Sequence, residues 1–409
     1  MTNELKDRIS KIRSGEVPEG YKKTKVGILP NDWNIVKLKD IAQHITKKNS
    51  EMKYTETLTN SAALGIINQT DYFEKQISNN NNIDGYYVVE EGDYSYNPRI
   101  SVSAPCGPIS KSHISETGIM SPLYTVFRFS DIDDSYYESY FKSSFWHRYM
   151  NSVANYGARF DRMNITNDDF FSMPLPSPPL PEQQKIAEIL STQDKVIDLI
   201  QNQIEELKKL KKAYLQKMFP QKGSLFPEIR FKGFTDAWEQ REFDKVFLSF
   251  PNKNYQLQST EYYESGKFPI IDQGKKAIIG YSDNESKVCN KYPSIIFGDH
   301  TTELKYVDFP FIIGADGVKT LSVKDGDTLF QYYNLQVNNV QPTGYNRHFS
   351  MLKEISLCVP CLAEQQQIGT YFRSLDTLIT LHQRKLEQEQ QKKKALMQLL
   401  LTGIVRVKV

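Results

Sequence analysis

The chain has 409 residues, of which 39% are hydrophobic, 12% aromatic and 24% charged, so it can form a packed core and is not wholly disordered. Fifty-one Lys and Arg against 49 Asp and Glu leave a net charge of +2, which neither indicates nor excludes a nucleic-acid partner, because such partners bind local patches. The length favours two or three domains. Four cysteines form no disulfide framework, and no stretch is typical of a signal peptide or a membrane span. We therefore expect a cytoplasmic protein without membrane contact.

The chain contains an internal repeat. Residues 182–219 and 364–401 match at a constant offset of 182 without gaps, and 13 of the 38 positions are identical. A weaker match joins residues 27–33 to residues 233–238, and each of these stretches ends in tryptophan. The stretches between these matches differ in length by 23 residues and show no convincing similarity. The sequence therefore predicts a pseudo-twofold protein with duplicated ends and divergent middles.

Each copy of the repeat predicts one long helix. Apolar residues recur every three or four positions, Pro181 is placed to begin the first helix, and Pro220 with Gly223 to end it. Thirty-eight residues at 1.5 Å each give about 57 Å. We expect the two helices to pair as a coiled coil, with a thin or wet seam at the polar residues 387–394. The alternative is that each helix caps its own globular domain. The candidate positions at the start and along the seam are Glu182, Gln183, Ile186, Leu190, Ile197, Ile204, Leu207, Glu364, Gln365, Ile368, Leu375, Leu378 and Leu386.

The middles predict two mixed α/β domains with many short strands. Turn residues separate the runs that predict strands, which are 85–89, 92–96, 123–127, 268–271 and 294–299. Helical spacing of aromatic and apolar residues appears at 136–150 and 326–339. Residues 219–227 form a short Pro/Gly linker. The predicted order is domain, helix, domain, helix.

Motifs for chemistry are incomplete. Ser177-Pro-Pro-Leu180 resembles the motif of amino-methyltransferases, but it lacks the aromatic residue and no glycine-rich cofactor turn accompanies it. Cys358 and Cys361 have CxxC spacing without two further zinc ligands at similar spacing. Glu285-Ser-Lys287 downstream of Asp272 is too common a pattern to indicate a nuclease. The six histidines form no metal-spaced pair. We therefore expect no catalytic residue, metal or cofactor site in this chain.

Basic and polar residues interleaved with aromatics favour nucleic-acid binding instead. Arg can read guanine, Asn can read adenine, and Lys binds phosphates. For any single residue, an ordinary solvated surface position is the more frequent outcome. The candidates are Tyr96, Asn97, Arg99, Lys111, Arg159 and Arg162 in the first half, and Lys275, Lys276, His300, Lys319, Tyr345, Asn346, Arg347 and His348 in the second.

The stretch from Pro179 to Ile186 resembles the specificity (S) subunit of type I restriction-modification systems. Supporting likenesses are residues 27–33, 231–238 and 400–405, so that the resemblance spans the chain. The second copy has Cys361-Leu-Ala in place of Pro-Leu-Pro, so that both prolines of this stretch are replaced.

The resemblance implies a non-catalytic subunit that reads a split, asymmetric site in double-stranded DNA. It implies an α+β fold: two mixed α/β target-recognition domains, separated by two long helices that form an antiparallel coiled coil and dock two adenine-methyltransferase (modification) subunits. S-adenosylmethionine, ATP and Mg²⁺ are then cofactors of the modification subunits and of the restriction/translocase subunits that join the complex.

The resemblance also implies five regions: an N-terminal arm (1–28), recognition domain 1 (29–173), a central helical region (174–222), recognition domain 2 (223–356) and a C-terminal helical region (357–409). Two other hypotheses remain: a stand-alone bipartite DNA-binding or scaffolding protein whose coiled coil is structural, and a self-sufficient nuclease or methyltransferase.

Overall fold

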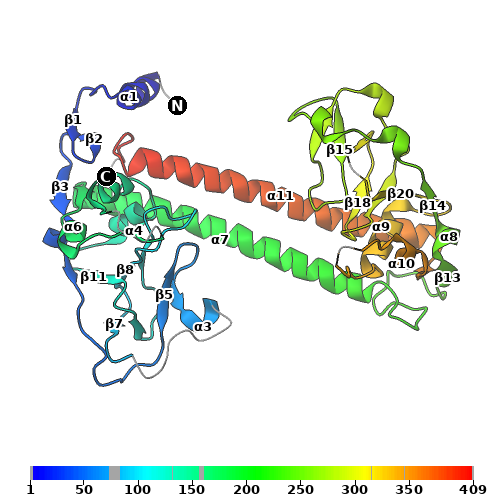
Figure 1. Cartoon of the computed structure of the whole chain (residues 1–409), viewed down its shortest axis with the longest axis horizontal. Coiled ribbons are helices and arrows are strands. Elements are labelled where there is room, and N and C mark those ends of the chain that lie inside the picture. The colour runs from blue at the N-terminus through cyan, green and yellow to red at the C-terminus, as the bar shows by residue number, and fades with distance from the viewer. Residues whose placement is uncertain are drawn as a thin grey trace. The chain divides into compact units, whose positions relative to one another are not determined.

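The computed structural model of the chain describes residues 3–72, 83–130, 132–155, 161–314, 316–344 and 346–407. These residues form two compact units. Unit 1 comprises Met1–Asp198 with Glu387–Val409, and unit 2 comprises Leu199–Leu386. Two long helices, α7 (Leu180–Lys217) and α11 (Leu362–Leu400), each contribute one part to each unit (Figure 1). The prediction of one long helix per repeat copy is confirmed, and each helix begins two residues before the matched stretch.

Unit 1 is built around a four-stranded antiparallel sheet of order β4-β11-β8-β9. A two-stranded ribbon of β3 and β12 leads the chain into and out of this domain. The elements before α7 are α1 (Asn3–Ser14), β1 (Tyr21–Thr24), β2 (Gly27–Pro30), β3 (Asn34–Lys37), α2 (Leu38–Ile41), β4 (Ala42–His44), β5 (Leu58–Ser61), β6 (Gly65–Asn68), α3 (Gln69–Tyr72), β7 (Tyr87–Val89), β8 (Tyr94–Tyr96), β9 (Ile109–Lys111), β10 (Gly118–Met120), β11 (Thr125–Phe129), α4 (Ser135–Phe141), α5 (His147–Val153), α6 (Asn167–Phe171) and β12 (Pro174–Ser177).

Unit 2 is built around a second four-stranded antiparallel sheet, of order β14-β20-β17-β18. A ribbon of β13 and β21 again leads the chain in and out. The elements before α11 are β13 (Glu239–Glu242), α8 (Phe243–Val246), β14 (Phe247–Phe250), η1 (Lys253–Tyr255), η2 (Ser259–Glu261), β15 (Phe268–Ile271), β16 (Gly280–Ser282), η3 (Glu285–Lys287), β17 (Ser294–Gly298), β18 (Leu304–Val307), β19 (Ile312–Ile313), β20 (Val318–Val323), α9 (Thr328–Val337), α10 (Phe349–Lys353) and β21 (Ser356–Val359).

The two sheets have the same strand order and the same pairing. β4, β11, β8 and β9 of unit 1 correspond in turn to β14, β20, β17 and β18 of unit 2. The short helices α2 and α8 follow the first ribbon strand in each unit, and α6 and α10 precede the second. The middles are therefore duplicated as well, although their sequences no longer show it. Backbone hydrogen bonds and a generic apolar core specify such a sheet, so many sequences satisfy it.

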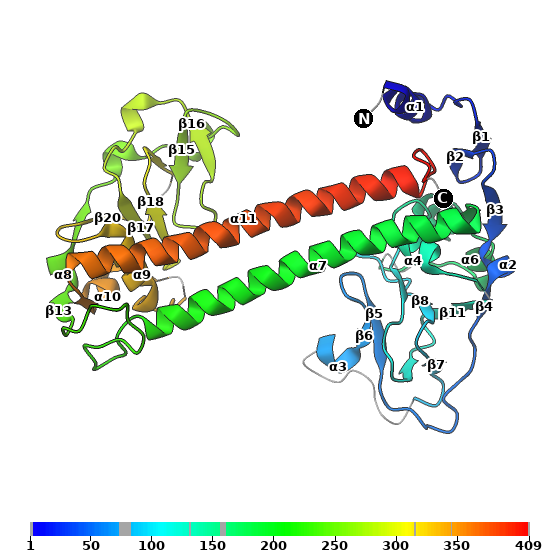
Figure 2. The same cartoon turned by 180° about the vertical axis from the view of Figure 1, so that it is seen from behind.

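The two long helices pack against each other in antiparallel directions within each unit. In unit 1, Ile186 and Leu190 of α7 share a core with Leu400 of α11. In unit 2, the ring of Tyr214 lies 5.6 Å from the ring of Tyr371. Both views show the start of α7 beside the end of α11 in unit 1 (Figure 2). The expected helix pairing is confirmed at the level of these contacts.

The seam within unit 1 is partly polar, as the sequence of residues 387–394 predicts. The Gln193 amide donates to the Glu389 carboxylate over 2.6 Å, and Lys393 pairs with Asp194. In unit 2, Lys211 lies 2.6 Å from Asp376. Ion pairs and hydrogen bonds between facing helices fix register more than they add stability.

Two local features differ from the sequence expectation. The aromatic run 136–150 forms two helices, α4 and α5, because the chain turns at Ser143–Trp146, where the Trp146 indole donates to the Phe141 carbonyl. The N-terminal arm contains a helix, α1, that was not expected. No helix in the described part of the chain is both long and apolar enough to cross a membrane.

Candidate nucleic-acid interface

Two loops meet in unit 2, and both carry residues that the sequence singles out. The first, which we name the connection loop, joins β17 to β18 (299–303). The second, the pre-helix loop, precedes α10 (338–344 and 346–348). His300 Nδ1 lies 3.1 Å from the carbonyl oxygen of Asn346, and the His348 amide donates to the Asp299 carbonyl over 2.8 Å. Side chains from distant parts of the sequence are therefore brought together.

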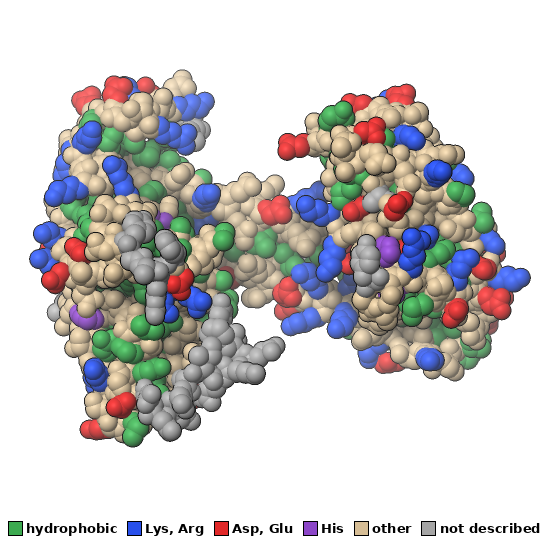
Figure 3. All heavy atoms as spheres, in the orientation of Figure 1, with side chains coloured by type: hydrophobic (Ala, Val, Ile, Leu, Met, Phe, Trp, Pro, Cys, Tyr) green, Lys and Arg blue, Asp and Glu red, His purple; other side chains and the backbone are tan. Residues whose placement is uncertain are grey.

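The segment after β15 joins this cluster. The side-chain oxygen of Gln273 accepts from the His300 amide over 3.1 Å, and the Thr301 hydroxyl donates to the Gln273 carbonyl. Lys305 binds the backbone carbonyls of Asp272 and Lys276. These contacts hold Lys275 and Lys276 on an exposed turn beside the connection loop. Figure 3 shows a histidine among Lys and Arg side chains on the visible face of this unit.

The same two loops meet in unit 1, where the connection loop (97–108) joins β8 to β9 and the pre-helix loop (161–166) precedes α6. The Ile100 amide donates to the Asp161 carbonyl and the Met163 amide to the Pro98 carbonyl, both over 2.9 Å. Arg99 and Arg162 face each other across this short bridge. Arg99 is exposed and Arg162 is partly exposed, so two guanidinium groups lie at one surface.

The correspondence between the units makes this surface the candidate site. In each unit a loop between the two corresponding strands contacts a loop before the corresponding helix. The fold of the site is repeated, whereas its side chains are Arg99 and Arg162 in one unit and His300, Asn346 and Arg347 in the other. A repeated scaffold with different polar groups is what two different binding specificities require.

Several predicted contacts lie at this surface, but others do not. Tyr96 is 3% exposed and stacks on Phe170, and His348 is fully buried, so a direct ligand contact is not supported for either. Lys111 is bound to Asp134 at 2.7 Å and is largely covered, and Lys319 lies 3.7 Å from Asp299, so both ammonium groups are already partnered. Aromatic and basic residue types are the same in a core and at an interface, so the sequence alone does not distinguish these positions.

The remaining candidates are placed as follows. Asn97 is half-buried, and its amide donates to the Asn60 carbonyl over 2.9 Å, which supports the connection loop from within. The exposed members of the predicted set are Arg99, Lys275, Lys276, Asn346 and Arg347. Arg159 and Tyr345 lie outside the described residues. Asn60, Gln273 and Asp299 were missed, since only the folded loops reveal their supporting roles.

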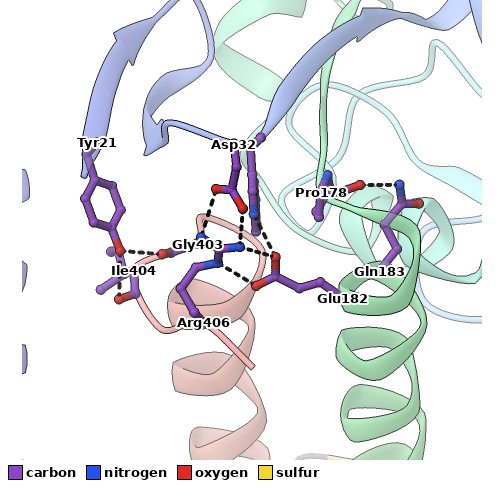
Figure 4. A network of polar contacts seen from close by, with 9 residues as sticks. Tyr21, Asp32, Pro178, Glu182, Gln183, Gly403, Ile404 and Arg406 are labelled. Carbon is purple, nitrogen blue, oxygen red and sulfur yellow. Dashed lines mark hydrogen bonds and ion pairs between the residues drawn. The ribbon is translucent and has the colours of Figure 1, made fainter. Parts of the chain in front are cut away.

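The Glu-Gln pair of each repeat anchors a long helix inside its own unit. In unit 1, buried Glu182 accepts from the Trp33 indole over 3.0 Å and from two nitrogens of Arg406, each over 2.7 Å (Figure 4). Gln183 donates to the Pro178 carbonyl over 2.8 Å. Gly403, at φ +68°, turns the chain so closely over Pro30 that an added Cβ would lie 2.6 Å from that ring.

Unit 2 repeats this anchor with one change. Glu364 is fully buried and forms a bidentate pair with Arg230, with both N–O distances 2.7 Å. Gln365 donates to the Pro360 carbonyl over 2.8 Å and accepts from the Asp327 amide over 3.0 Å. Within the described residues the indole nitrogen of buried Trp238 makes no hydrogen bond, whereas its counterpart Trp33 does. Hydrogen bonds with the carboxylates raise the pKa of Arg230 and of Arg406.

The anchors change the interpretation of the docking candidates. Glu182, Gln183, Glu364 and Gln365 are buried and saturated by internal contacts, so docking through their side chains is not supported. The other predicted positions are also covered: Ile186, Leu190, Ile197, Ile204, Ile368 and Leu375 are buried, and Leu207 and Leu386 are half-buried.

Leu378 is 39% exposed and lines, with Leu329 and Leu381, a depression of about 350 Å³ in unit 2. Leu199 and Leu210 of α7 are also exposed. Exposed leucines on a polar helix are the better candidates for a partner.

The cysteines and the possible metal ligands form no metal site in the described part of the chain. Cys358 is half-buried and donates to the Ser224 carbonyl, and Cys361 is exposed. No three His, Cys, Asp or Glu side chains among the described residues gather as they would around a metal ion.

Comparison with known proteins points to one family. Residues 30–209 and 235–390 match the model of the type I restriction modification DNA specificity domain. A Methanocaldococcus jannaschii protein assigned as the type I restriction enzyme MjaX specificity subunit is 25% identical over 95% of this chain and 97% of its own length. The MjaVIII specificity subunit from the same organism is 29% identical over 58% of this chain and 64% of its own length. The fold is similar to that of the type I restriction-modification S subunit from M. genitalium, with a TM-score of 0.59 at 16% identity, covering 90% of this chain and 96% of that one.

Proposed function

Because the chain belongs to the family of type I restriction-modification DNA specificity subunits, we propose that it reads a split, asymmetric site in double-stranded DNA, one half-site with each unit. Members of this family are the non-catalytic DNA-recognition components of their systems. The observation that carries the split-site proposal is the loop pair that recurs in both units with different side chains.

The chemistry of the loops fits base reading. Arg99 and Arg162 offer bidentate donors that match the major-groove edge of guanine. The amide nitrogen of Asn346 donates to the Thr343 carbonyl, and its second N–H with the amide oxygen matches the edge of adenine. Lys275 and Lys276 are exposed and have no carboxylate within 4 Å among the described residues, so they are free to contact phosphates. Unit 1 and unit 2 would then read different sequences through the same fold.

Catalysis would come from partners. We propose that two modification subunits dock on the long helices, through exposed leucines such as Leu378 and Leu381, and that restriction subunits join through them. S-adenosylmethionine, ATP and Mg²⁺ would bind to those partners and not to this chain. The pseudo-twofold repeat supports two copies of one partner, since exposed Leu199 of α7 is the counterpart of exposed Leu381 of α11 at the repeat offset of 182.

Mapping of methylated adenines in DNA from cells that express the complete system tests the proposal. A single bipartite motif with two unlike halves is expected. Exchange of residues 40–173 for the corresponding domain of another specificity subunit should change one half and leave the other unchanged. Changes in both halves, or a continuous motif, would contradict reading by separate units.

The alternative is a stand-alone bipartite DNA-binding or scaffolding protein. Purified chain should be assayed for DNA methylation alone and together with candidate modification subunits, with S-adenosylmethionine and Mg²⁺ present in both cases. Methylation only in the presence of the partners supports the specificity-subunit role. Unchanged, partner-independent DNA binding without methylation favours the alternative, and activity of the lone chain would contradict both.

A further inference from the structure

We propose that buried His348 is a positioning residue that determines which bases unit 2 reads. Its imidazole ties the pre-helix loop to the connection loop and so fixes the relative positions of His300, Asn346 and Arg347. The inference rests on the proposed function and deepens it, because it assigns the base preference of one half-site to a side chain that never touches DNA.

Both nitrogens of the imidazole are used. Nε2 lies 2.9 Å from the backbone nitrogen of Thr343, and because that group can only donate, Nε2 must accept. The proton of the neutral ring is therefore on Nδ1, which donates to the Asp299 carbonyl over 3.0 Å. The ring is fully buried, so water cannot replace either hydrogen bond without opening the loop.

The connection loop offers a rigid attachment point at Asp299. Its carbonyl accepts from both the amide and the ring of His348, and its carboxylate accepts from the Phe349 amide over 2.8 Å. Asp299 is itself 2% exposed. Gly298 precedes it at a point where a Cβ would lie 2.8 Å from the Gln273 carbonyl, so the backbone cannot shift toward that side. The imidazole therefore holds the pre-helix loop in a fixed position relative to Asp299.

Residues of the tethered loop would meet DNA. Asn346 and Arg347 are exposed, and they lie between the two points, Thr343 and His348, that the imidazole holds together. A base-edge hydrogen bond tolerates little displacement, since its energy falls steeply outside about 2.7–3.2 Å. Loss of the tether would thus relax base preference in the reading loop while phosphate contacts from Lys275 and Lys276 persist.

Unit 1 achieves the same junction by another route. There the two loops are joined by two backbone hydrogen bonds, from Ile100 to Asp161 and from Met163 to Pro98. No side chain is needed for that bridge. The half-site of unit 1 is consequently an internal control for any substitution at His348.

Two substitutions of His348 each retain one of its two side-chain hydrogen bonds and remove the other. In His348→Gln the amide oxygen can reach the position of Nε2 and accept from Thr343, whereas in His348→Asn the shorter amide can reach only the position of Nδ1 and donate to Asp299. His348→Leu removes both. The complex of each variant with its modification subunits should be used to select duplexes from a pool randomised at both half-sites.

In every variant the backbone amide of His348 can still donate to the Asp299 carbonyl, whereas the bond from the Thr343 amide needs an acceptor on the side chain of residue 348. We therefore expect His348→Leu and His348→Asn, which lose the contact with Thr343, to reduce base preference at one or two positions of the unit 2 half-site by roughly 5- to 150-fold, the range for one bidentate contact. His348→Gln should retain most of the preference. The unit 1 half-site should be unchanged in all three variants. A rescue by Gln and not by Asn is a pattern that a purely structural role of the ring would not produce.

Leu357→Ala is the matched control, because Leu357 is also fully buried in unit 2 but lies in β21. It should lower thermal stability and leave base preference intact. Unchanged preference in His348→Leu, or equal relaxation in Leu357→Ala, would overturn the inference. If the wild-type complex selects no bipartite site, the proposed function itself fails, and the positioning role fails with it.

Discussion

Loss of the Arg230–Glu364 pair, which anchors α11 in unit 2, should lower the stability of that unit strongly. Glu364 is fully buried, and the side chain of Arg230 is only 15% exposed. Arg230→Met removes both charge-assisted hydrogen bonds and leaves an uncompensated carboxylate in the core. Removal of one partner of such a pair costs about 3–5 kcal/mol. For a unit of about 150–250 residues this corresponds to a fall in melting temperature of roughly 6–20 °C.

Arg406→Met is the matched variant in unit 1, and it should cost less. Glu182 keeps the hydrogen bond from the Trp33 indole, and Arg406 is 37% exposed, so solvent already screens part of its pairing. In unit 2, Trp238 gives Glu364 no such support. The double variant Arg230→Met with Glu364→Gln should recover much of the loss, because no charge is left buried without a partner.

Differential scanning calorimetry of the purified chain measures these changes. We expect Arg230→Met to lower the melting temperature most, Arg406→Met less, and the double variant least. If Arg230→Met shifts the transition by less than about 2 °C, or if Arg406→Met is the more damaging, the buried pair does not anchor α11 as described.

Three further predictions follow from the described contacts. Replacement of Lys275 and Lys276 by Ala should weaken binding to all duplexes alike and lower the slope of log K against log salt by about two, as filter binding at several ionic strengths would show. A four-residue insertion in α7 lengthens that helix by about 6 Å and should alter the tolerated spacer by roughly one to two base pairs with both half-sites unchanged; an unaltered spacer in the methylation map would refute a spacing role for the helix. Hydrogen bonding to Arg406 lowers the pKa of Asp32 below its ordinary 3.8. The stabilisation of unit 1 by this contact is therefore complete above pH 3.8 and is lost as the pH falls through the lower pKa of the folded state. In Asp32→Asn, the free energy of unfolding measured with urea should depend less on pH in the acid range.

The long helices could be predicted from the sequence because their signal is local. Apolar residues at intervals of three and four, with proline before and proline and glycine after, specify α7 without reference to the rest of the chain. The polar stretch 387–394 likewise predicted a polar seam, and Gln193 with Glu389 provides it. Short strands were found where aromatic and β-branched runs lie between turns, although β8 begins two residues after the start of its predicted run and β11 is shifted by two residues from its own.

The contacts that shape the site could not be predicted, because they join residues far apart in the chain. Arg230 reaches Glu364 across 134 residues, and nothing in either local sequence marks the pair. His348 follows Asn346 and Arg347 in one polar run, yet it is turned inward while they are exposed. Burial at this scale depends on how β17 and α10 meet, which local propensity does not encode.

Comparison of the two units shows which features folding constrains and which side chains can vary without loss of the fold. The sheets, the ribbons and the Glu-Gln anchors recur because each satisfies buried backbone groups or a buried carboxylate, and a substitution there costs stability directly. The connection and pre-helix loops keep only their mutual contact, which is made by two backbone bonds, at Ile100 and Met163, in unit 1 and by one backbone bond together with the ring of His348 in unit 2. Since the frame does not depend on the identity of the exposed side chains, those side chains can change with little effect on folding. A duplicated scaffold can thereby diverge in the DNA it recognises while its fold is retained.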